Sequence, residues 1–114
     1  IFKKADRMHK VEQLADEIRF QLKEDILSFG WMVQIAQLQN PKDAPAAHVN
    51  AVFEAIILLR ASDEIVVGAA KNVAGHVRIE PWPEQGEELR SRLIQTSDSA
   101  TGLDRDFCFW IQSR

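Results

Sequence analysis

A chain of 114 residues is long enough to bury one hydrophobic core and too short for two, so we predict a single domain over residues 1–114. Its composition, 46% hydrophobic and 27% charged, is that of an ordinary globular protein and argues against a disordered chain. The net charge of −3 argues against general binding to nucleic acid or to an anionic membrane, and it leaves open a basic protein partner.

The cysteine content and the lack of long apolar runs bear on cellular location. Cys108 has no second cysteine with which to form an internal disulfide, which suits a reducing cytosol. No apolar run approaches the ~20 residues that a membrane span needs, and the start of the chain lacks the apolar core of a secretory signal. We therefore predict a cytoplasmic protein, in which residues 1–7 are an expression remnant or an upstream extension before Met8.

The first segment with a clear pattern is an N-terminal helix, predicted over residues 8–27. Apolar residues recur at spacings of three and four from Met8 to Ile26, which places them on one helical stripe. Gly30 is expected to interrupt this pattern, because glycine in mid-helix costs about 1 kcal/mol relative to alanine.

Two further helices are predicted over residues 31–39 and 46–60. The first continues the apolar pattern and ends before an Asn-Pro pair. The second carries apolar residues over more than half of its circumference, which predicts that it is the central, most buried helix.

Two strands follow these helices and are close enough in sequence to form a hairpin. The β-branched run at residues 65–69 is typical of a strand. Residues 76–80 alternate between polar and apolar, which predicts a half-buried strand with Val77 and Ile79 facing inward.

A Pro-Trp-Pro segment separates the second strand from another predicted helix. Pro81 is expected to end the strand because it has no N–H to donate, and Pro83 suits the first turn of a helix. Trp82 is predicted to fill the core where the strand becomes a helix. In that helix, Glu88 and Arg92 are spaced to pair across one turn.

The end of the chain is predicted to be a loop followed by an aromatic strand. Residues 96–102 are polar and indicate a loop, and residues 106–112 indicate the strand. Alternation within this strand places Phe107, Phe109 and Ile111 on one face.

Taken in order, these elements predict an α+β fold, with N-terminal helices followed by a small antiparallel sheet that has one inserted helix. The middle section, helices followed by a hairpin, is winged-helix-like.

Catalytic and metal-binding chemistry is poorly supported by the sequence. His9, His48 and His76 lie in three different elements, and no two of them have metal-ligand spacing. A nucleophilic Cys108 is an alternative, but a thiol within an aromatic strand usually behaves as a small buried hydrophobe. We therefore predict a protein that is not an enzyme and that has no metal site and no cofactor.

Carboxylates in the second half of the chain are the predicted partner-binding residues. If the fold brings them together, they form a negative surface that steers a basic partner. Asp104 and Asp106 are expected to point the same way, since residues two apart in an extended chain share a face. The candidate residues are Glu80, Glu84, Glu87, Glu88, Asp98, Asp104 and Asp106.

A winged-helix regulator that binds nucleic acid is the alternative function. Its recognition helix would be the one at residues 46–60, which offers His48, Asn50, Glu54 and Arg60 outside its apolar surface. That set is a poor match to phosphates and base edges, so nucleic acid is not the favoured partner.

Residues 55–112 resemble a diffuse group of small uncharacterised bacterial proteins, through the segments GHVRIEPWP, EELRSRLI and DFCFWIQ. In size, charge and single-domain build, this group is similar to the immunity proteins that protect bacteria from toxins. The resemblance implies a bacterial interaction module that binds and blocks a toxin, for instance a nuclease with a basic groove. A homodimer is left open by the sequence.

Overall fold

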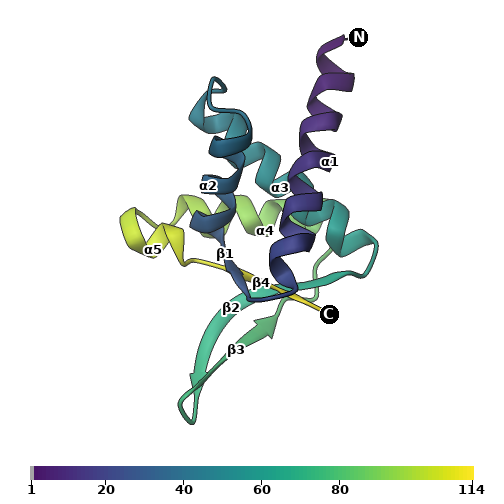
Figure 1. Cartoon of the computed structure of the whole chain (residues 1–114). Helices are drawn as coiled ribbons and strands as arrows, with labels where there is room; N and C mark the ends of the chain where they lie inside the picture. The colour runs from purple at the N-terminus through teal and green to yellow at the C-terminus, as the bar shows by residue number, and fades with distance from the viewer. Residues whose placement is uncertain (1) are drawn as a thin grey trace.

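The computed structural model of the chain describes the backbone of residues 2–114 and the side chains from residue 7 onward. Residue 1 and the side chains of residues 2–6 lie outside the described part, and with them most of the expected extension at residues 1–7. The described residues form five helices and a four-stranded antiparallel sheet, which confirms the predicted α+β fold with N-terminal helices (Figure 1). In chain order the elements are α1 (Phe2–Leu22), β1 (Leu27–Ser28), α2 (Phe29–Gln39), α3 (Pro45–Ala61), β2 (Ile65–Val73), β3 (His76–Pro81), α4 (Gly86–Asp98), α5 (Gly102–Asp106) and β4 (Trp110–Ser113).

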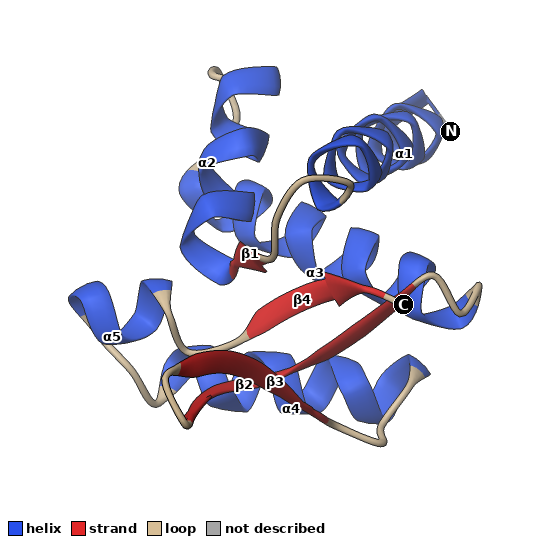
Figure 2. Ribbon diagram, turned by 60° about the horizontal axis from the view of Figure 1, so that its bottom comes forward, coloured by secondary structure: helices blue, strands red, loops and turns tan. Residues whose placement is uncertain are grey.

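The sheet has the strand order β1–β4–β2–β3, and all neighbouring strands are antiparallel (Figure 2). β2 forms the expected hairpin with β3 and pairs on its other side with β4. The short β1 also pairs with β4, through Leu27 opposite Ile111. The last strand of the chain therefore joins the segment between the first two helices to the hairpin.

α3 is the central helix, as its sequence predicts. It packs against α1, α2 and α4, and Val52, Ala55 and Ile56 on it are fully buried. From α1, Leu14 and Ile18 join the same core. Figure 1 shows that the hairpin of β2 and β3 extends away from these helices.

The connection from α1 through β3 follows the order helix, strand, helix, helix, hairpin, which agrees with the winged-helix-like middle section. The sheet differs from that simple arrangement because β4 lies between β1 and β2. Within residues 2–114, no helix combines the length and the apolar content that a membrane crossing requires.

The N-terminal helix, α1, begins and ends earlier than the predicted range of 8–27. Ile26 lies beyond its end, and Ser28 belongs to β1 while also capping the start of α2. Gly30 is therefore in the first turn of α2 and does not separate two helices. A Cβ at Gly30 would approach Asp106 of α5 to 2.7 Å, so close packing explains the glycine.

The inward orientation predicted for Val77 is wrong. Val77 is 59% exposed, and Ile79 is only partly buried. The physical reason is that this part of the hairpin extends beyond the helices, so no second layer covers it. Ala74 and Gly75, which form its tip, have φ angles of 52° and 83° and make a tight two-residue turn.

The helix that follows the Pro-Trp-Pro segment begins later than predicted. Pro81 is the last residue of β3, but α4 starts at Gly86, so Pro83 is not in its first turn. The Trp82 N–H donates to the Val67 carbonyl at 2.8 Å. Sheet pairing therefore continues past Pro81 and delays the start of the helix.

Trp82 is only partly buried, so it fills the core less completely than predicted. One side of its ring meets Phe109, with centroids 6.0 Å apart, and the Arg92 guanidinium lies 4.3 Å from its centroid. Arg92 is held by Glu84 at 2.7 Å. The predicted pair of Arg92 with Glu88 is therefore wrong, since Arg92 reaches back over Trp82.

The end of the chain is more helical than predicted. α4 continues to Asp98, so the expected loop at residues 96–102 begins as helix, and α5 starts at its last residue, Gly102. The expected strand at residues 106–112 is reduced to β4. Phe107 precedes β4 and is 52% exposed, so its predicted place on one face with Phe109 is wrong.

Candidate functional site

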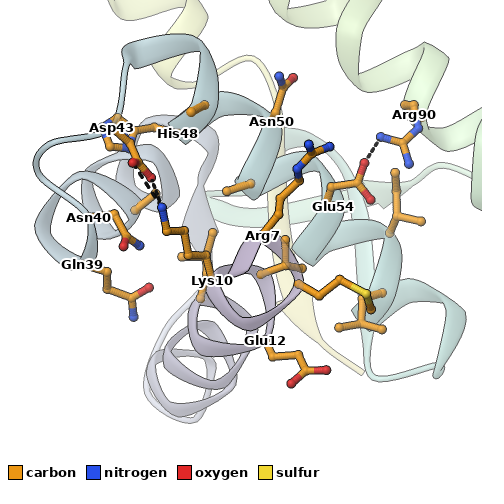
Figure 3. Close-up of a pocket in the computed structure, with 18 of the residues that line it drawn as sticks. Arg7, Lys10, Glu12, Gln39, Asn40, Asp43, His48, Asn50, Glu54 and Arg90 are labelled. Atoms are coloured by element: carbon orange, nitrogen blue, oxygen red, sulfur yellow. Dashed lines mark hydrogen bonds and ion pairs between the residues drawn. The ribbon is translucent and has the colours of Figure 1, made fainter. Parts of the chain in front are cut away.

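A groove runs along α3, between α1 and α4 (Figure 3). It has a volume of about 1140 Å³, and the turn after α2 also contributes to its lining. We call it the α3 groove, and its lining includes Met8 and Lys10 from α1, Ala51, Glu54 and Leu58 from α3, and Arg90 and Ile94 from α4.

The floor of the α3 groove is apolar. On α3, spacings of four and seven residues place Ala47, Ala51 and Leu58 on one helical face, and all three line the groove. Leu58 and Ile94 remain 42% and 41% exposed. The groove thus leaves contiguous apolar side chains open to solvent, which commonly marks an interaction site.

Four of the six charged side chains that line the groove form pairs of opposite charge, and Arg7 and Glu12 are the other two. Lys10 contacts Asp43 at 3.1 Å. Arg90 pairs with Glu54 and with the exposed Glu87, and its hydrogen bond to the Glu54 carboxylate raises the pKa of the Arg90 guanidinium. These pairs partly cancel the charge beside the apolar floor, which favours an apolar occupant over a small ion.

One polar atom of the groove lining has no partner. The Gln39 side-chain amide donates to the Gln13 carbonyl at 3.4 Å, while its Oε1 is buried without a hydrogen bond within the described residues. A buried acceptor left unpaired costs about 1–3 kcal/mol. Because this oxygen is closed to solvent, the cost falls on the fold itself and the atom offers no contact to a partner.

The carboxylates predicted as partner-binding residues fall into separate groups. Glu84, Glu87 and Glu88 lie close together in sequence at the start of α4, but Asp98 is its last residue. At 1.5 Å per residue, Asp98 lies about 16 Å along the helix from Glu87. Glu87 and Glu88 are therefore grouped in the first turn of α4, and Glu84 lies just before it.

The other predicted carboxylates are placed by different elements. Glu80 lies on β3 and pairs with Lys71, and both side chains are exposed. Asp104 and Asp106 belong to α5, so the expectation that they share one face of an extended chain is wrong. In a helix, residues two apart point in different directions.

The environment of Glu84 differs from that of the exposed Glu87 and Glu88. Its hydrogen bond from Arg92 lowers the pKa of the Glu84 carboxyl, and its side chain is only 25% exposed. Glu84 therefore helps to hold Arg92 over Trp82. Glu87 and Glu88 are the members of this group that a partner can reach.

The residues considered for catalysis are not brought together. Burial raises the pKa of the Cys108 thiol, which disfavours the reactive thiolate. His48 is buried and lines the α3 groove, while His9 and His76 are exposed on α1 and β3. Among the described residues, no group of three or more His, Cys, Asp or Glu side chains could hold a metal ion.

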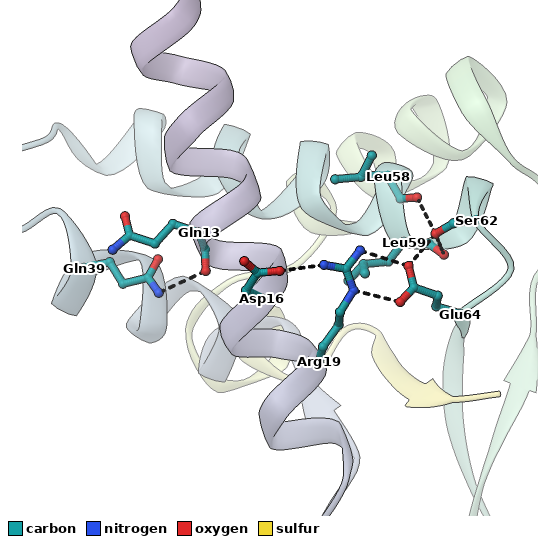
Figure 4. A network of polar contacts seen from close by, with 8 residues as sticks. All are labelled: Gln13, Asp16, Arg19, Gln39, Leu58, Leu59, Ser62 and Glu64. Carbon is teal, nitrogen blue, oxygen red and sulfur yellow. Dashed lines mark hydrogen bonds and ion pairs between the residues drawn. The ribbon is translucent and has the colours of Figure 1, made fainter.

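A polar network that the sequence does not reveal joins α1 to the segment between α3 and β2 (Figure 4). Arg19 donates to both carboxylate oxygens of Glu64, at 2.7 and 3.0 Å, and Asp16 accepts a further bond from Arg19. Ser62 also donates to Glu64. These bonds fix the position of α1, which is one wall of the α3 groove.

Protonation of Glu64 is expected to weaken this network in acid. The hydrogen bond from Arg19 lowers the pKa of Glu64 from 4.5 to about 2. The stabilisation is therefore complete above pH 4.5 and is lost as the pH falls toward 2. Because the pair is over a third exposed, we expect an effect of about 1 kcal/mol or less.

Urea unfolding as a function of pH tests this prediction. Between pH 5 and 2, roughly the range in which this group titrates, Glu64→Gln should lose stability less steeply than the original chain. Glu24→Gln, at an exposed position after α1, is the control and should follow the original profile. Parallel profiles for all three proteins would contradict the role given to Glu64.

No protein-family model matches this chain, and neither the curated proteins nor the solved structures contain a match.

The sequence alone does not identify the residues of the α3 groove. Ala51 and Leu58 lie within the helix that is predicted to be the most buried, and nothing in the predicted pattern separates them from its core residues. The alanine spacing on α3 was the available signal, since small residues leave room for a neighbouring chain.

Proposed function

We propose that this protein acts by binding another protein, and that the α3 groove receives a segment of that partner. The observation that carries the proposal is an apolar floor that stays open to solvent between two helices, with Leu58 and Ile94 both exposed. Helices that dock in grooves place apolar side chains at such floors.

The dimensions of the groove favour a polypeptide over a small molecule. Its volume of about 1140 Å³ exceeds the roughly 300–1,000 Å³ of typical small-molecule pockets. Small-molecule sites are also enclosed enough to bury roughly 70–90% of their ligand, and a few convergent polar groups fix its orientation. Here the charged pairs Lys10–Asp43 and Arg90–Glu54 are satisfied within the chain.

The chemistry of the groove describes the partner segment that would fit. An amphipathic helix would place apolar side chains against Leu58 and Ile94. Basic residues at one end of that helix would meet Glu87 and Glu88 at the start of α4. The net charge of −3 would speed the approach of such a partner.

In finer terms, we propose an immunity protein that binds and blocks a bacterial toxin with a basic surface. The resemblance of residues 55–112 to small bacterial proteins of this build supports it, as do the exposed carboxylates of α4. The chain would act by covering the toxin's active site or substrate groove. Co-expression with such a toxin should permit growth that the toxin alone prevents.

Leu58→Arg is expected to abolish partner binding while leaving the fold intact. The change introduces a charge into the apolar floor, and Leu58 is exposed enough for the free protein to tolerate it. A partner obtained with a photocrosslinker at position 58 would be titrated against both proteins. We expect affinity to fall at least about a hundredfold, as for the loss of a central contact.

Leu38→Arg is the matched control, since Leu38 is exposed on α2 and does not line the groove. It should bind the partner like the original chain. Equal binding by the Leu58 and Leu38 variants would place the interface elsewhere and refute the groove. Slower association at higher salt would support steering by Glu87 and Glu88.

Nucleic-acid binding remains the second candidate because the element order from α1 to β3 is that of a winged helix. The exposed side chains of α3 weigh against it, because none of them is a basic residue. They are Pro45, Ala46, Ala47, Asn50, Leu58 and Ala61. A duplex shifted at low salt and released at higher salt would favour this function over protein binding.

A further inference from the structure

β3 is an edge strand whose outer side is uncovered. The sheet order places it last, next to β2. The helices pack mainly on one another and on the other three strands. All of its residues except Ile79 are exposed. An uncovered edge of this kind offers a template for pairing with another strand.

The hydrogen-bonding direction along β3 follows from its register with β2. In an antiparallel pair, residues alternate between those that bond to the neighbour and those that face away. The tight turn closes at the pair Val73–His76, and the Trp82 N–H donates to Val67 at the other end. The backbone groups of the even-numbered residues of β3 therefore bond to β2. Those of Val77, Ile79 and Pro81 point away from β2, toward the open edge.

The side chains of β3 divide into an apolar and a charged set. Val77, Ile79 and Pro81 share one face, and His76, Arg78 and Glu80 share the other. On the charged face, Arg78 lies directly opposite Lys71 of β2, and it has no ion-pair partner among the described residues. Lys71 pairs with Glu80. Arg78 is thus a cation beside a second cation.

We propose that a second copy of this chain pairs with the β3 edge, antiparallel, with the twofold axis at Ile79. In this register each Arg78 lies opposite Glu80 of the other copy, and the two Ile79 residues face each other. Ile79 exchanges two hydrogen bonds with its counterpart, and each Val77 N–H donates to the carbonyl of the opposite Pro81. The lack of an N–H on Pro81 leaves just one carbonyl of Val77 to solvent at each end.

Charge complementarity selects this register over its neighbours. An axis at Arg78 would place the two Arg78 side chains directly opposite each other, and an axis at Val77 would place His76 opposite Arg78. Like charges in directly opposed positions are destabilising, whereas opposite charges stabilise the pair. Only the axis at Ile79 gives two opposite-charge pairs, and it makes the eight-stranded sheet of the dimer self-complementary.

Arg78→Glu tests the interface without weakening the hairpin that carries it. The new carboxylate lies opposite Lys71 of its own chain and should stabilise the hairpin. In the dimer it would face Glu80 of the second copy, twice by symmetry. Sedimentation velocity over a concentration series should show a dimer dissociation constant raised at least about tenfold.

The double variant Arg78→Glu, Glu80→Arg restores opposite charges across the axis at Ile79, and we expect a dissociation constant within about threefold of the original. Lys71→Glu is the matched control, since it makes the same charge change on the same face but one strand away from the interface. It should leave dimerisation nearly unchanged.

Amide exchange gives an independent measurement. Val77 and Ile79 amides should become protected as the concentration rises, because they bond only in the dimer. A chain that is monomeric at every concentration would show that the charges of β3 serve to prevent pairing, and the proposal would be overturned. Failure of the double variant to restore the dimer would overturn the register.

Discussion

Replacing Phe109 by alanine is expected to lower the free energy of unfolding by about 3–5 kcal/mol, the range for large aromatic truncations in cores. Phe109 is fully buried, and its ring lies 4.8 Å from that of Phe29 and 6.0 Å from that of Trp82. Its carbonyl accepts the Phe29 N–H. The residue therefore joins α2, the end of β3 and the start of β4 at one point.

Urea unfolding of Phe109→Ala and Phe107→Ala measures this effect with a matched control. Phe107 is the same residue type two positions earlier, and it stacks on Trp110 at the surface. Its truncation should cost about 1 kcal/mol or less. Similar costs for the two variants would mean that the aromatic core is not centred on Phe109.

The same two phenylalanines show why the end of the chain could not be fully predicted. Alternation in residues 106–112 favours a strand, and from Trp110 onward a strand forms. Phe107 and Cys108 instead donate to the carbonyls of Leu103 and Arg105 in the preceding helical turn. That turn packs on α2, which is a tertiary contact that local alternation cannot reveal.

The N-terminal helix and α4 were correctly predicted to be helices, and only the positions of their ends were wrong. In both cases a strand partner far along the chain determines the boundary. Leu27 pairs with Ile111, which stops the first helical pattern, and Trp82 bonds to Val67, which delays α4. Helical periodicity shows which residues can share an apolar face, but it cannot predict strand pairing with a distant part of the chain.

The candidate site was predictable only in part. Glu87 and Glu88 are exposed at the start of α4 as the sequence suggests, because acidic residues favour the positive end of a helix dipole. The α3 groove was not predictable, because an apolar position on a helix can be covered or open. Ile56 is buried and Leu58 is exposed on the same helix, and the difference depends on where α1 and α4 lie.

Gly68→Ala is expected to destabilise the chain by about 3 kcal/mol, at the upper end of the cost of overpacking. A Cβ at Gly68 would lie 1.9 Å from the Glu80 carbonyl oxygen and 2.7 Å from its carbon. These are backbone atoms, so no side-chain rotation can relieve the collision. Gly68 pairs with Pro81 on one side and Trp110 on the other, so β2 cannot move away from β3 without disturbing β4.

Gly86→Ala separates this collision from ordinary backbone strain. Gly86 has a φ of 58° with nothing within 4 Å of an added Cβ, so alanine there should cost about 1–2 kcal/mol through conformation alone. Hydrogen exchange distinguishes the two causes, because displacing β3 at Gly68 should break the bond from the Trp82 N–H to Val67. We expect the Trp82 amide to lose protection in Gly68→Ala and to keep it in Gly86→Ala. The opposite outcome would be equal stability of the two variants, with the Trp82 amide protected in both. It would mean that β2 and β3 can separate at Gly68 without moving Trp82. The close approach of these two strands would then not determine where β3 ends.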